Sequence, residues 1–285
     1  MIIAAAQSIV SNDIAENGRT IRALIAQAAN EGARLVNFCE GALSGYSKAQ
    51  IPAPEDWRNV DWNGHAAELE AISETCGKHK IFASVGSAHP LGASHPPFNS
   101  QHVFSDAGKL LGRYHKRYLS NSELSGWFTP GLGPFTFEVD SYKFGCLTCI
   151  EVHFPELFME YERLNVDAIL FSSYGIRNFF QIALRAHAGF NCLWISGATP
   201  AQTANEGPAG IIGPDGKIVS NCSAEQKNAL AFATLDRNDP VYDIPLNKAR
   251  QWRREARRGE IYKGKHIEKW CASGQVISRT EPSRR

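Results

Sequence analysis

Residues 144–156 read FGCLTCIEVHFPE, an apolar run that ends at Cys149 and is followed by a proline six residues later. The run predicts a buried strand, and Pro155 stands where proline is favoured, in the first turn of a helix. A further strand is expected at 168–173 and a further helix at 179–190. Strands that alternate with helices in this way define the α/β class.

The N-terminal part of the chain repeats this alternation. Its apolar spacing predicts strands at 1–9, 35–39 and 81–86 and helices at 15–30 and 66–76. Turn sequences also predict a β-hairpin in each half, around Ser105-Asp106-Ala107-Gly108 and Pro214-Asp215-Gly216. Two mixed β-sheets packed face to face, with helices outside, would accommodate these strands. We expect one domain over 1–262 and a tail at 263–285 that packs on a surface or on a neighbouring subunit.

Composition and charge narrow the class of protein. The 285 residues are 43% hydrophobic and 21% charged, as in a soluble globular protein. Because 30 Lys and Arg nearly balance 29 Asp and Glu, neither nucleic acid nor a membrane is expected as a partner. The arginine-rich stretch at 250–258 is interpreted as a solvated, partly paired helix face rather than a polyanion site. Seven irregularly spaced cysteines favour a reduced, cytoplasmic protein over a disulfide framework.

Three residues with useful chemistry each stand at the C-terminal edge of an apolar run: Glu40, Lys116 and Cys149. In α/β folds, sites assemble at the carboxyl ends of strands, where the loops diverge. A thiol at a strand-to-helix turn meets backbone N–H groups that can hold an oxyanion. A nearby lysine would favour the thiolate, and a carboxylate could carry the thiol proton to a leaving amine.

The sequence around each of these residues resembles the nitrilase superfamily of carbon–nitrogen hydrolases. Residues 38–46, FCEGALSGY, resemble its first signature, and residues 112–119, GRYHKRYL, resemble its lysine motif. Residues 145–156 resemble its nucleophile motif. The order Glu, Lys, Cys also matches, and the resemblance runs over most of the chain.

The resemblance implies a role for each residue. Cys149 would attack the amide or nitrile carbon, and Glu40 would act as general base and then as acid. Lys116 would stabilise the oxyanion together with the backbone N–H of Ile150. Glu123 looks like the second glutamate of the family, which orients the lysine. We also expect Tyr46 and Tyr174 to contact the substrate.

The family further implies an αββα sandwich with four layers, no metal or other cofactor, and a homodimer or a higher homo-oligomer. The expected partner is a small-molecule amide or nitrile. On this basis the predicted activity is cleavage of a small amide to a carboxylic acid and ammonia through a cysteine thioester.

Departures from the family pattern favour an amide over other substrates. Cys39 replaces a proline, which is expected to change packing more than chemistry, and Glu151 and His153 replace the usual Asp and Arg. The tryptophan that follows the cysteine in true nitrilases is absent. N-carbamoyl hydrolases place arginines near the nucleophile, where this chain offers only the more distant Arg177 and Arg185. Nitrilase and N-carbamoyl hydrolase activities therefore remain the alternatives.

Three other interpretations are open. Cys146 and Cys149 form a C-x-x-C pair that could be a redox motif or half of a zinc site. Cys149 could instead pair with His153 or His115, as in papain-like enzymes. In the last alternative, the protein is a catalytically silent binding protein on the same fold.

Overall fold

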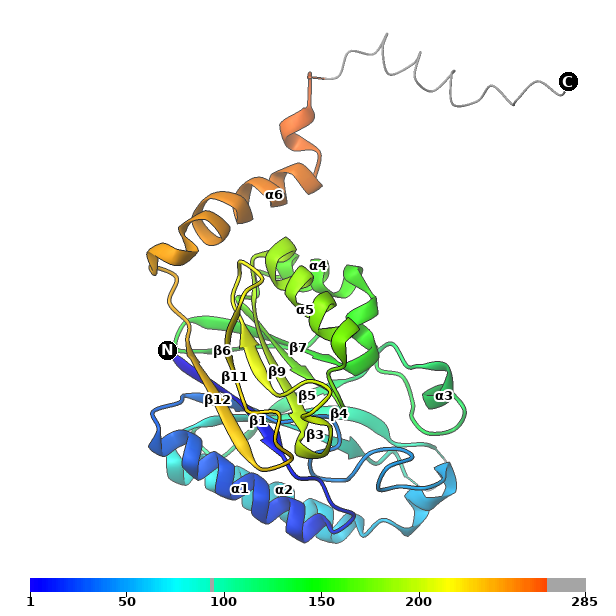
Figure 1. Cartoon of the computed structure of the whole chain (residues 1–285). Helices are drawn as coiled ribbons and strands as arrows, with labels where there is room; N and C mark the ends of the chain where they lie inside the picture. Colours follow the sequence, from blue (N-terminus) through cyan, green and yellow to red (C-terminus); the bar gives the residue numbers. More distant parts are fainter. Residues whose placement is uncertain (93–94, 266–285) are drawn as a thin grey trace, which may run out of the picture.

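The computed structural model describes residues 1–92 and 95–265, and the predicted tail falls outside them from residue 266 on. Strands alternate with helices in both halves (Figure 1). The first half contains β1 (Ile2–Ser8), α1 (Ile14–Asn30), β2 (Leu35–Asn37), α2 (Trp62–His79), β3 (Phe82–His89), β4 (Phe98–Phe104) and β5 (Leu110–His115). The predicted α/β class is therefore confirmed. No helix of the described part is long and apolar enough to cross a bilayer.

The second half contains both the predicted elements and two that the apolar spacing did not indicate, α3 and β6. Its elements are α3 (Asn121–Leu124), β6 (Thr136–Val139), β7 (Tyr142–Thr148), α4 (Pro155–Arg163), β8 (Ala168–Ser172), α5 (Asn178–Asn191), β9 (Trp194–Pro200), β10 (Gly210–Ile212), β11 (Ile218–Asn221), β12 (Ala229–Thr234) and α6 (Arg250–Arg257). α3 and β6 have four residues each, too few to produce a periodic signal.

The strands form one twelve-stranded sheet, which corrects the prediction of two separate sheets. Its order is β5-β4-β3-β2-β1-β9-β8-β7-β6, with β12 paired to β1 and with β10 and β11 beyond β9. Backbone strand pairing joins the two halves where β1 pairs with β9, through Gln7 with Thr199 and Ser8 with Pro200. Each half is mixed, as predicted, because parallel strands lie at its centre and antiparallel hairpins at its edge.

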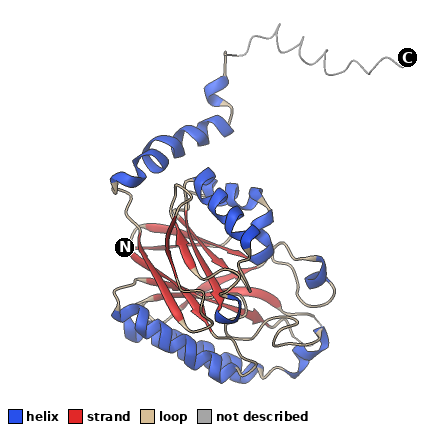
Figure 2. Ribbon diagram, viewed as in Figure 1, coloured by secondary structure: helices blue, strands red, loops and turns tan. Residues whose placement is uncertain are grey.

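Helices cover both sides of the strands (Figure 2), with α1 and α2 on one side and α4 and α5 on the other. Strand β1 contributes side chains to both hydrophobic cores. Ala4 and Ala6 pack with α1 and α2, while Ile3 and Ala5 pack into the core that includes β7, β8 and β9. The amide of Asn37 on β2 donates to carbonyl oxygens of β8 and β9. This bond joins the inner faces of the two half-sheets.

The arginine-rich segment is a helix whose side chains are partly paired, as predicted. Helix α6 buries no residue, and its arginines reach the ends of α4 and α5. Arg254 and Arg257 form ion pairs with the buried carboxylate of Glu162, and Arg250 pairs with Asp167. Because helix C-termini carry partial negative charge, cations are favoured at these places.

A row of four histidines lies between α2 and the outer face of β3, β4 and β5. The ring centroids of His65 and His102 are 6.4 Å apart, those of His102 and His89 are 5.7 Å apart, and those of His89 and His115 are 5.6 Å apart. His65 and His115 bond to serine hydroxyls, whereas the fully buried ring nitrogens of His102 have no hydrogen-bond partner among the described residues. Burial, reinforced by neighbouring rings, lowers the pKa of His65 and of His115 to about 4.

The histidine row predicts a loss of stability in mild acid. In the unfolded chain these imidazoles bind protons below a pKa near 6.5, while in the folded chain they stay neutral down to about pH 4. The free energy of unfolding should therefore fall as the pH drops from about 6.5 to about 4, by up to roughly 1.4 kcal/mol per pH unit for each buried histidine. Urea unfolding at pH 7, 6 and 5 measures this slope.

His102→Leu should reduce the dependence of unfolding on pH even if it changes stability at pH 7. His95 is exposed, so His95→Gln is the matched control and should keep the wild-type slope. A slope unchanged in His102→Leu would contradict this account of the histidine row.

Candidate active site

Glu40 directly follows Cys39 beyond the end of β2, where the backbone turns away. Its side chain is fully buried, and Gly41 takes a positive φ of 67° that favours glycine. The neighbouring strand β3 contributes Gly86, where a Cβ would collide with the carbonyl oxygen of Cys39. Glycine at this position lets the backbone of Cys39 and Glu40 approach β3 closely.

Lys116 holds the centre of the site. Its side chain is fully buried, and the ammonium Nζ lies 2.9 Å from Oε1 of Glu40 and 2.6 Å from Oε1 of Glu123. Removing one partner of such a buried pair costs about 3–5 kcal/mol, because a charge is left uncompensated. The predicted residues Glu40, Lys116 and Glu123 are thus in direct contact.

Glu123 is held by the start of α3. Ser120 and Glu123 form a reciprocal capping box, in which the backbone N–H of Ser120 donates to Oε2 of Glu123 and the N–H of Glu123 bonds to the serine hydroxyl. The other carboxylate oxygen is left for Lys116 and, at 3.4 Å, for the hydroxyl of Tyr46. A short helix of four residues therefore fixes the orientation of this carboxylate.

Cys149 lies at the turn between β7 and the 3₁₀ helix η2 (Cys149–His153). Its φ of 51° is in the left-handed region, which an L-residue rarely adopts outside sites that impose it. The N–H of Ile150 is in the first turn of η2, where N–H groups have no partner within the helix. An oxyanion formed at the thiol could accept from this N–H.

Lys116 lowers the pKa of the Cys149 thiol, as expected, but other effects outweigh it. Burial and the neighbouring charge of Glu40 raise its pKa to about 12, and these effects outweigh Lys116 and a hydrogen bond with Ser173, which lower it. A thiol with so high a pKa needs a base before it can act as a nucleophile.

The two carboxylates differ in acidity. Burial, together with the charge of Glu123, raises the pKa of Glu40 despite the opposing effect of Lys116. Burial acts in the same direction on Glu123, but the charge and hydrogen bond of Lys116 and the bonds from Ser120 outweigh it and lower the pKa. The charges of Glu40, Cys149 and Glu123 keep the pKa of Lys116 well above its ordinary value despite burial. The site thus combines a cation, a firm anion and a carboxyl group that accepts a proton more readily.

Asn99 is a site residue that the motifs did not reveal. Its side-chain amide donates to Oε1 of Glu40 at 2.7 Å and approaches Oε1 of Glu123 at 3.5 Å, and its carbonyl oxygen accepts from the N–H of Lys116. The hairpin register contained the signal, because Ser100 pairs with His115 and Asn99 must therefore lie opposite Lys116.

The aromatic residues predicted to contact substrate lie beside this cluster. The rings of Tyr46 and Tyr174 stack with centroids 4.7 Å apart, and the backbone N–H of Tyr174 donates to Oε2 of Glu40 at 3.0 Å. The hydroxyl of Tyr174 is bonded to Gln50. Tyr174 therefore holds the carboxylate through its backbone while its ring supports Tyr46.

The geometry bears on the rival interpretations of the cysteines. Both Cys146 and Cys149 are free, and Cys146, a residue of β7, is fully buried in the hydrophobic core. The ring of His153 stacks on Phe179, and His115 bonds to Ser100 on the outer face of the sheet. Within the described residues, no group of three or more His, Cys, Asp or Glu side chains could hold a metal ion.

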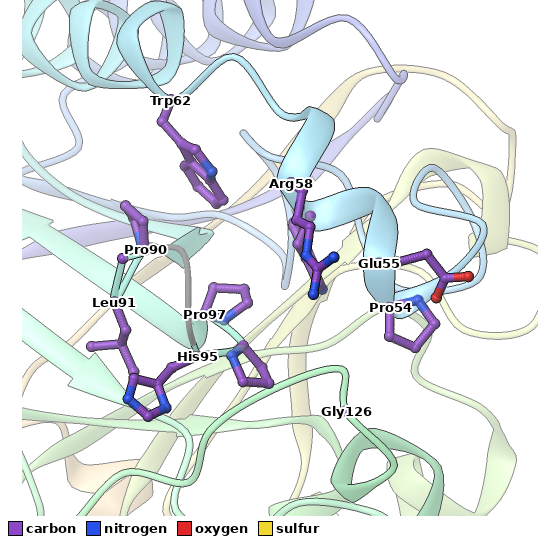
Figure 3. Close-up of a pocket in the computed structure, with 12 residues that line it drawn as sticks. Pro54, Glu55, Arg58, Trp62, Pro90, Leu91, His95, Pro97 and Gly126 are labelled. Atoms are coloured by element: carbon purple, nitrogen blue, oxygen red, sulfur yellow. The ribbon is translucent and has the colours of Figure 1, made fainter.

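A pocket of about 590 Å³ lies on another part of the surface (Figure 3). Trp62, Pro90, Leu91 and Arg58 are among the residues that line it, whereas none of the four predicted catalytic residues does. Trp57 also lines it and packs on Phe128, whose ring faces Tyr46 at 6.4 Å. An aromatic layer thus separates this pocket from the buried charges.

Comparisons with known proteins place this geometry in context. The family model described as carbon-nitrogen hydrolase matches residues 2–241. A chloroplastic omega-amidase of Arabidopsis thaliana is 24% identical over 278 residues, which cover 90% of this chain and 72% of that protein. An omega-amidase of Danio rerio is 24% identical over 271 residues, with 87% and 94% covered. The crystal structure of an amidase from Nesterenkonia sp. superposes with a TM-score of 0.74 at 21% identity, covering 88% of this chain and 96% of that one.

Asn99→Leu should raise the pKa of Glu40 further, because the variant loses the hydrogen bond from the Asn99 amide that favours the ionised form of Glu40. In a plot of the rate of Cys149 alkylation by iodoacetamide against pH, the fall in rate at low pH should then begin at a higher pH. Ser100→Ala is the matched control, since Ser100 is the next residue of β4 and bonds to His115 on the opposite face. An identical limb in Asn99→Leu and wild type would show that Asn99 does not tune Glu40.

Gly86→Ala should displace the turn at Glu40, because the added methyl group meets the carbonyl of Cys39. We expect a destabilisation of about 1–3 kcal/mol, as for other overpacked sites, and slower alkylation of Cys149. Thermal unfolding and alkylation rates measure the two effects. Gly133→Ala, at a glycine with open space around it, should change neither. Equal stability of the two variants would contradict the close approach of Glu40 to β3.

Proposed function

Because the chain belongs to the carbon-nitrogen hydrolase family, we propose that it hydrolyses a small amide to a carboxylic acid and ammonia. The intermediate is a thioester on Cys149. Glu40 serves as general base and acid, Lys116 stabilises the oxyanion, and Glu123 orients the lysine.

One observation carries the proposal: the ammonium of Lys116 is buried between two carboxylates and interacts electrostatically with the Cys149 thiol, which is held at a strained turn. A protein that only needed stability would gain more from apolar side chains of similar volume at these positions. Perturbed titratable groups that gather around a nucleophile are typical of catalytic sites. The arrangement contains a nucleophile, a base and an oxyanion stabiliser, which acyl transfer requires.

The first half of the reaction forms the thioester. Glu40 takes the proton of the Cys149 thiol as sulfur bonds to the amide carbon, and the carbonyl oxygen becomes an oxyanion. The ammonium of Lys116 and the N–H of Ile150 stabilise that charge. As the carbon–nitrogen bond breaks, Glu40 returns the proton to the departing nitrogen, and ammonia leaves.

The second half releases the acid. Glu40, again ionised, takes a proton from a water molecule that attacks the thioester carbon. The carbon–sulfur bond then breaks, and the proton returns to the sulfur of Cys149. The raised pKa of Glu40 suits a group that accepts and donates a proton in turn, while the lowered pKa of Glu123 keeps a counter-charge for Lys116 throughout.

The surroundings of the site favour a simple amide over an N-carbamoyl amino acid. An N-carbamoyl substrate would need a cation for its carboxylate. Arg177 forms an ion pair with Glu206, and Arg185 donates to the carbonyl of Gly216. Both arginines therefore already have partners. The absence of a tryptophan after Cys149 likewise supports an amide over a nitrile.

Relatives support the same substrate class. The Nesterenkonia amidase has been solved in complex with butyramide and with acrylamide added at its active-site cysteine. The curated relatives are omega-amidases. Small aliphatic amides are therefore the first substrates to test. The homo-oligomer implied by the family remains a proposal, which sedimentation velocity would test.

Incubation with butyramide or acrylamide should release ammonia, and Cys149→Ala should abolish the release. Mass spectrometry of protein quenched during turnover should locate an acyl adduct on Cys149. Cys146→Ala is the matched control, because it removes the other thiol of the C-x-x-C pair and should keep the adduct.

Labelling of another residue would refute the thioester mechanism. If the protein releases no ammonia from any of a broad panel of amides and nitriles while Cys149 still reacts with iodoacetamide, the catalytically silent binding protein would be favoured instead.

A further inference from the structure

A third buried glutamate, Glu151, lies two residues after the nucleophile and is not used by the mechanism above. Its side chain is fully inaccessible to solvent. Burying a carboxylate is costly unless hydrogen bonds compensate, so its contacts indicate what it is held for.

Four groups bond to this carboxylate from three segments of the chain. Oε1 accepts from the hydroxyl of Tyr114 at 2.7 Å, from the N–H of Arg117 at 2.8 Å and from the N–H of Tyr118 at 3.2 Å. Oε2 accepts from the N–H of Thr148 at 2.7 Å. The contacts flank Lys116 on both sides and reach the residue directly before Cys149.

The donors around Glu151 fit the ionised form of its carboxylate. Burial raises the pKa of Glu151, and the hydrogen bonds and the charge of Lys116 offset that rise only in part. Three of the four partners are backbone N–H groups, which can only donate, and the hydroxyl of Tyr114 already accepts from Arg117. A protonated carboxyl offers fewer acceptor lone pairs, so at least one of these four bonds would be weakened.

A helix cap alone does not account for this arrangement. The bond to Thr148 is part of a capping box at the start of η2. The other three bonds leave η2 and end on β5 and on the segment that follows Lys116. They join two parts of the chain that are more than 30 residues apart.

We propose that Glu151 is a positioning residue that fixes the ammonium of Lys116 relative to the thiol of Cys149. Its carboxylate bridges the segment that carries the lysine and the turn that carries the nucleophile. The inference rests on the proposed function, because it assigns Glu151 to the same reaction. A misplacement of about 1 Å can cost roughly 100-fold in rate, which sets the scale of the expected effect.

Glu151→Gln tests the proposal, because it keeps the length of the side chain but directs an NH₂ group at backbone donors. We expect kcat on butyramide to fall about 100-fold with KM nearly unchanged. The rate of Cys149 alkylation by iodoacetamide should fall at least about tenfold. Glu151→Asp keeps the charge but is one methylene shorter, so its rates should lie between those of the wild type and of Glu151→Gln.

Glu162→Gln is the matched control. Glu162 is also a buried glutamate, but it pairs with Arg254 and Arg257 of α6, so its substitution should affect stability and leave alkylation unchanged. Tyr114→Phe removes a single bond to Glu151 and provides a milder variant should Glu151→Gln not fold. We expect it to slow alkylation about three- to tenfold, on the scale of one hydrogen bond.

The two hypotheses fail in different ways. Folded Glu151→Gln that alkylates at the wild-type rate would overturn the positioning role, as would wild-type alkylation in Tyr114→Phe when Glu151→Gln does not fold. Alkylation needs no amide turnover. A wild type that alkylates at Cys149 but hydrolyses no amide would defeat the proposed function, and the alkylation rates would still decide the role of Glu151.

Discussion

The buried ammonium of Lys116 is the constraint on which the rest of the site depends. A lysine without solvent contact must be surrounded by acceptors, and here Glu40 approaches it from the turn after β2 and Glu123 from helix α3. The edge strand β5 must therefore end close to β2, although β4 and β3 lie between them in the sheet order. The hairpin of β4 and β5, Gly86 on β3 and the short helix α3 satisfy that requirement.

Opposing effects set the pKa of each ionisable group around Lys116. Burial favours neutral carboxyl groups, while the lysine favours ionised ones, and the result differs between Glu40 and Glu123 because only Glu123 also accepts from Ser120. In the proposed mechanism, this difference lets Glu40 carry a proton while Glu123 remains a counter-charge for Lys116. Burial also raises the pKa of the Cys149 thiol, which is why the proposed mechanism needs a base to form the thiolate.

The sequence predicts the class, nearly all of the longer elements and the four residues of the cluster, because periodic apolar runs and the family motifs are both local signals. It does not predict that β1 and β9 join the half-sheets, since two residue pairs carry that contact. Asn99 and Glu151 are missed for another reason. Each acts through partners far away in sequence, and only the hairpin register or the folded turn brings those partners together. The raised pKa of the Cys149 thiol also depends on burial, which a sequence motif does not encode.

Strand β1 has a consequence for how the chain is made. It precedes the other described strands along the chain, yet it pairs with β12, and the amino group of Met1 bonds to the carbonyl oxygen of Leu235. Its edge toward β12 remains open until residues 229–234 have been translated, because β12 follows the other described strands. Contacts of such long sequence separation slow folding and leave an unpaired strand edge that can associate with other chains. Nascent chains that stop before β12 should therefore depend on chaperones in a way that the finished protein does not.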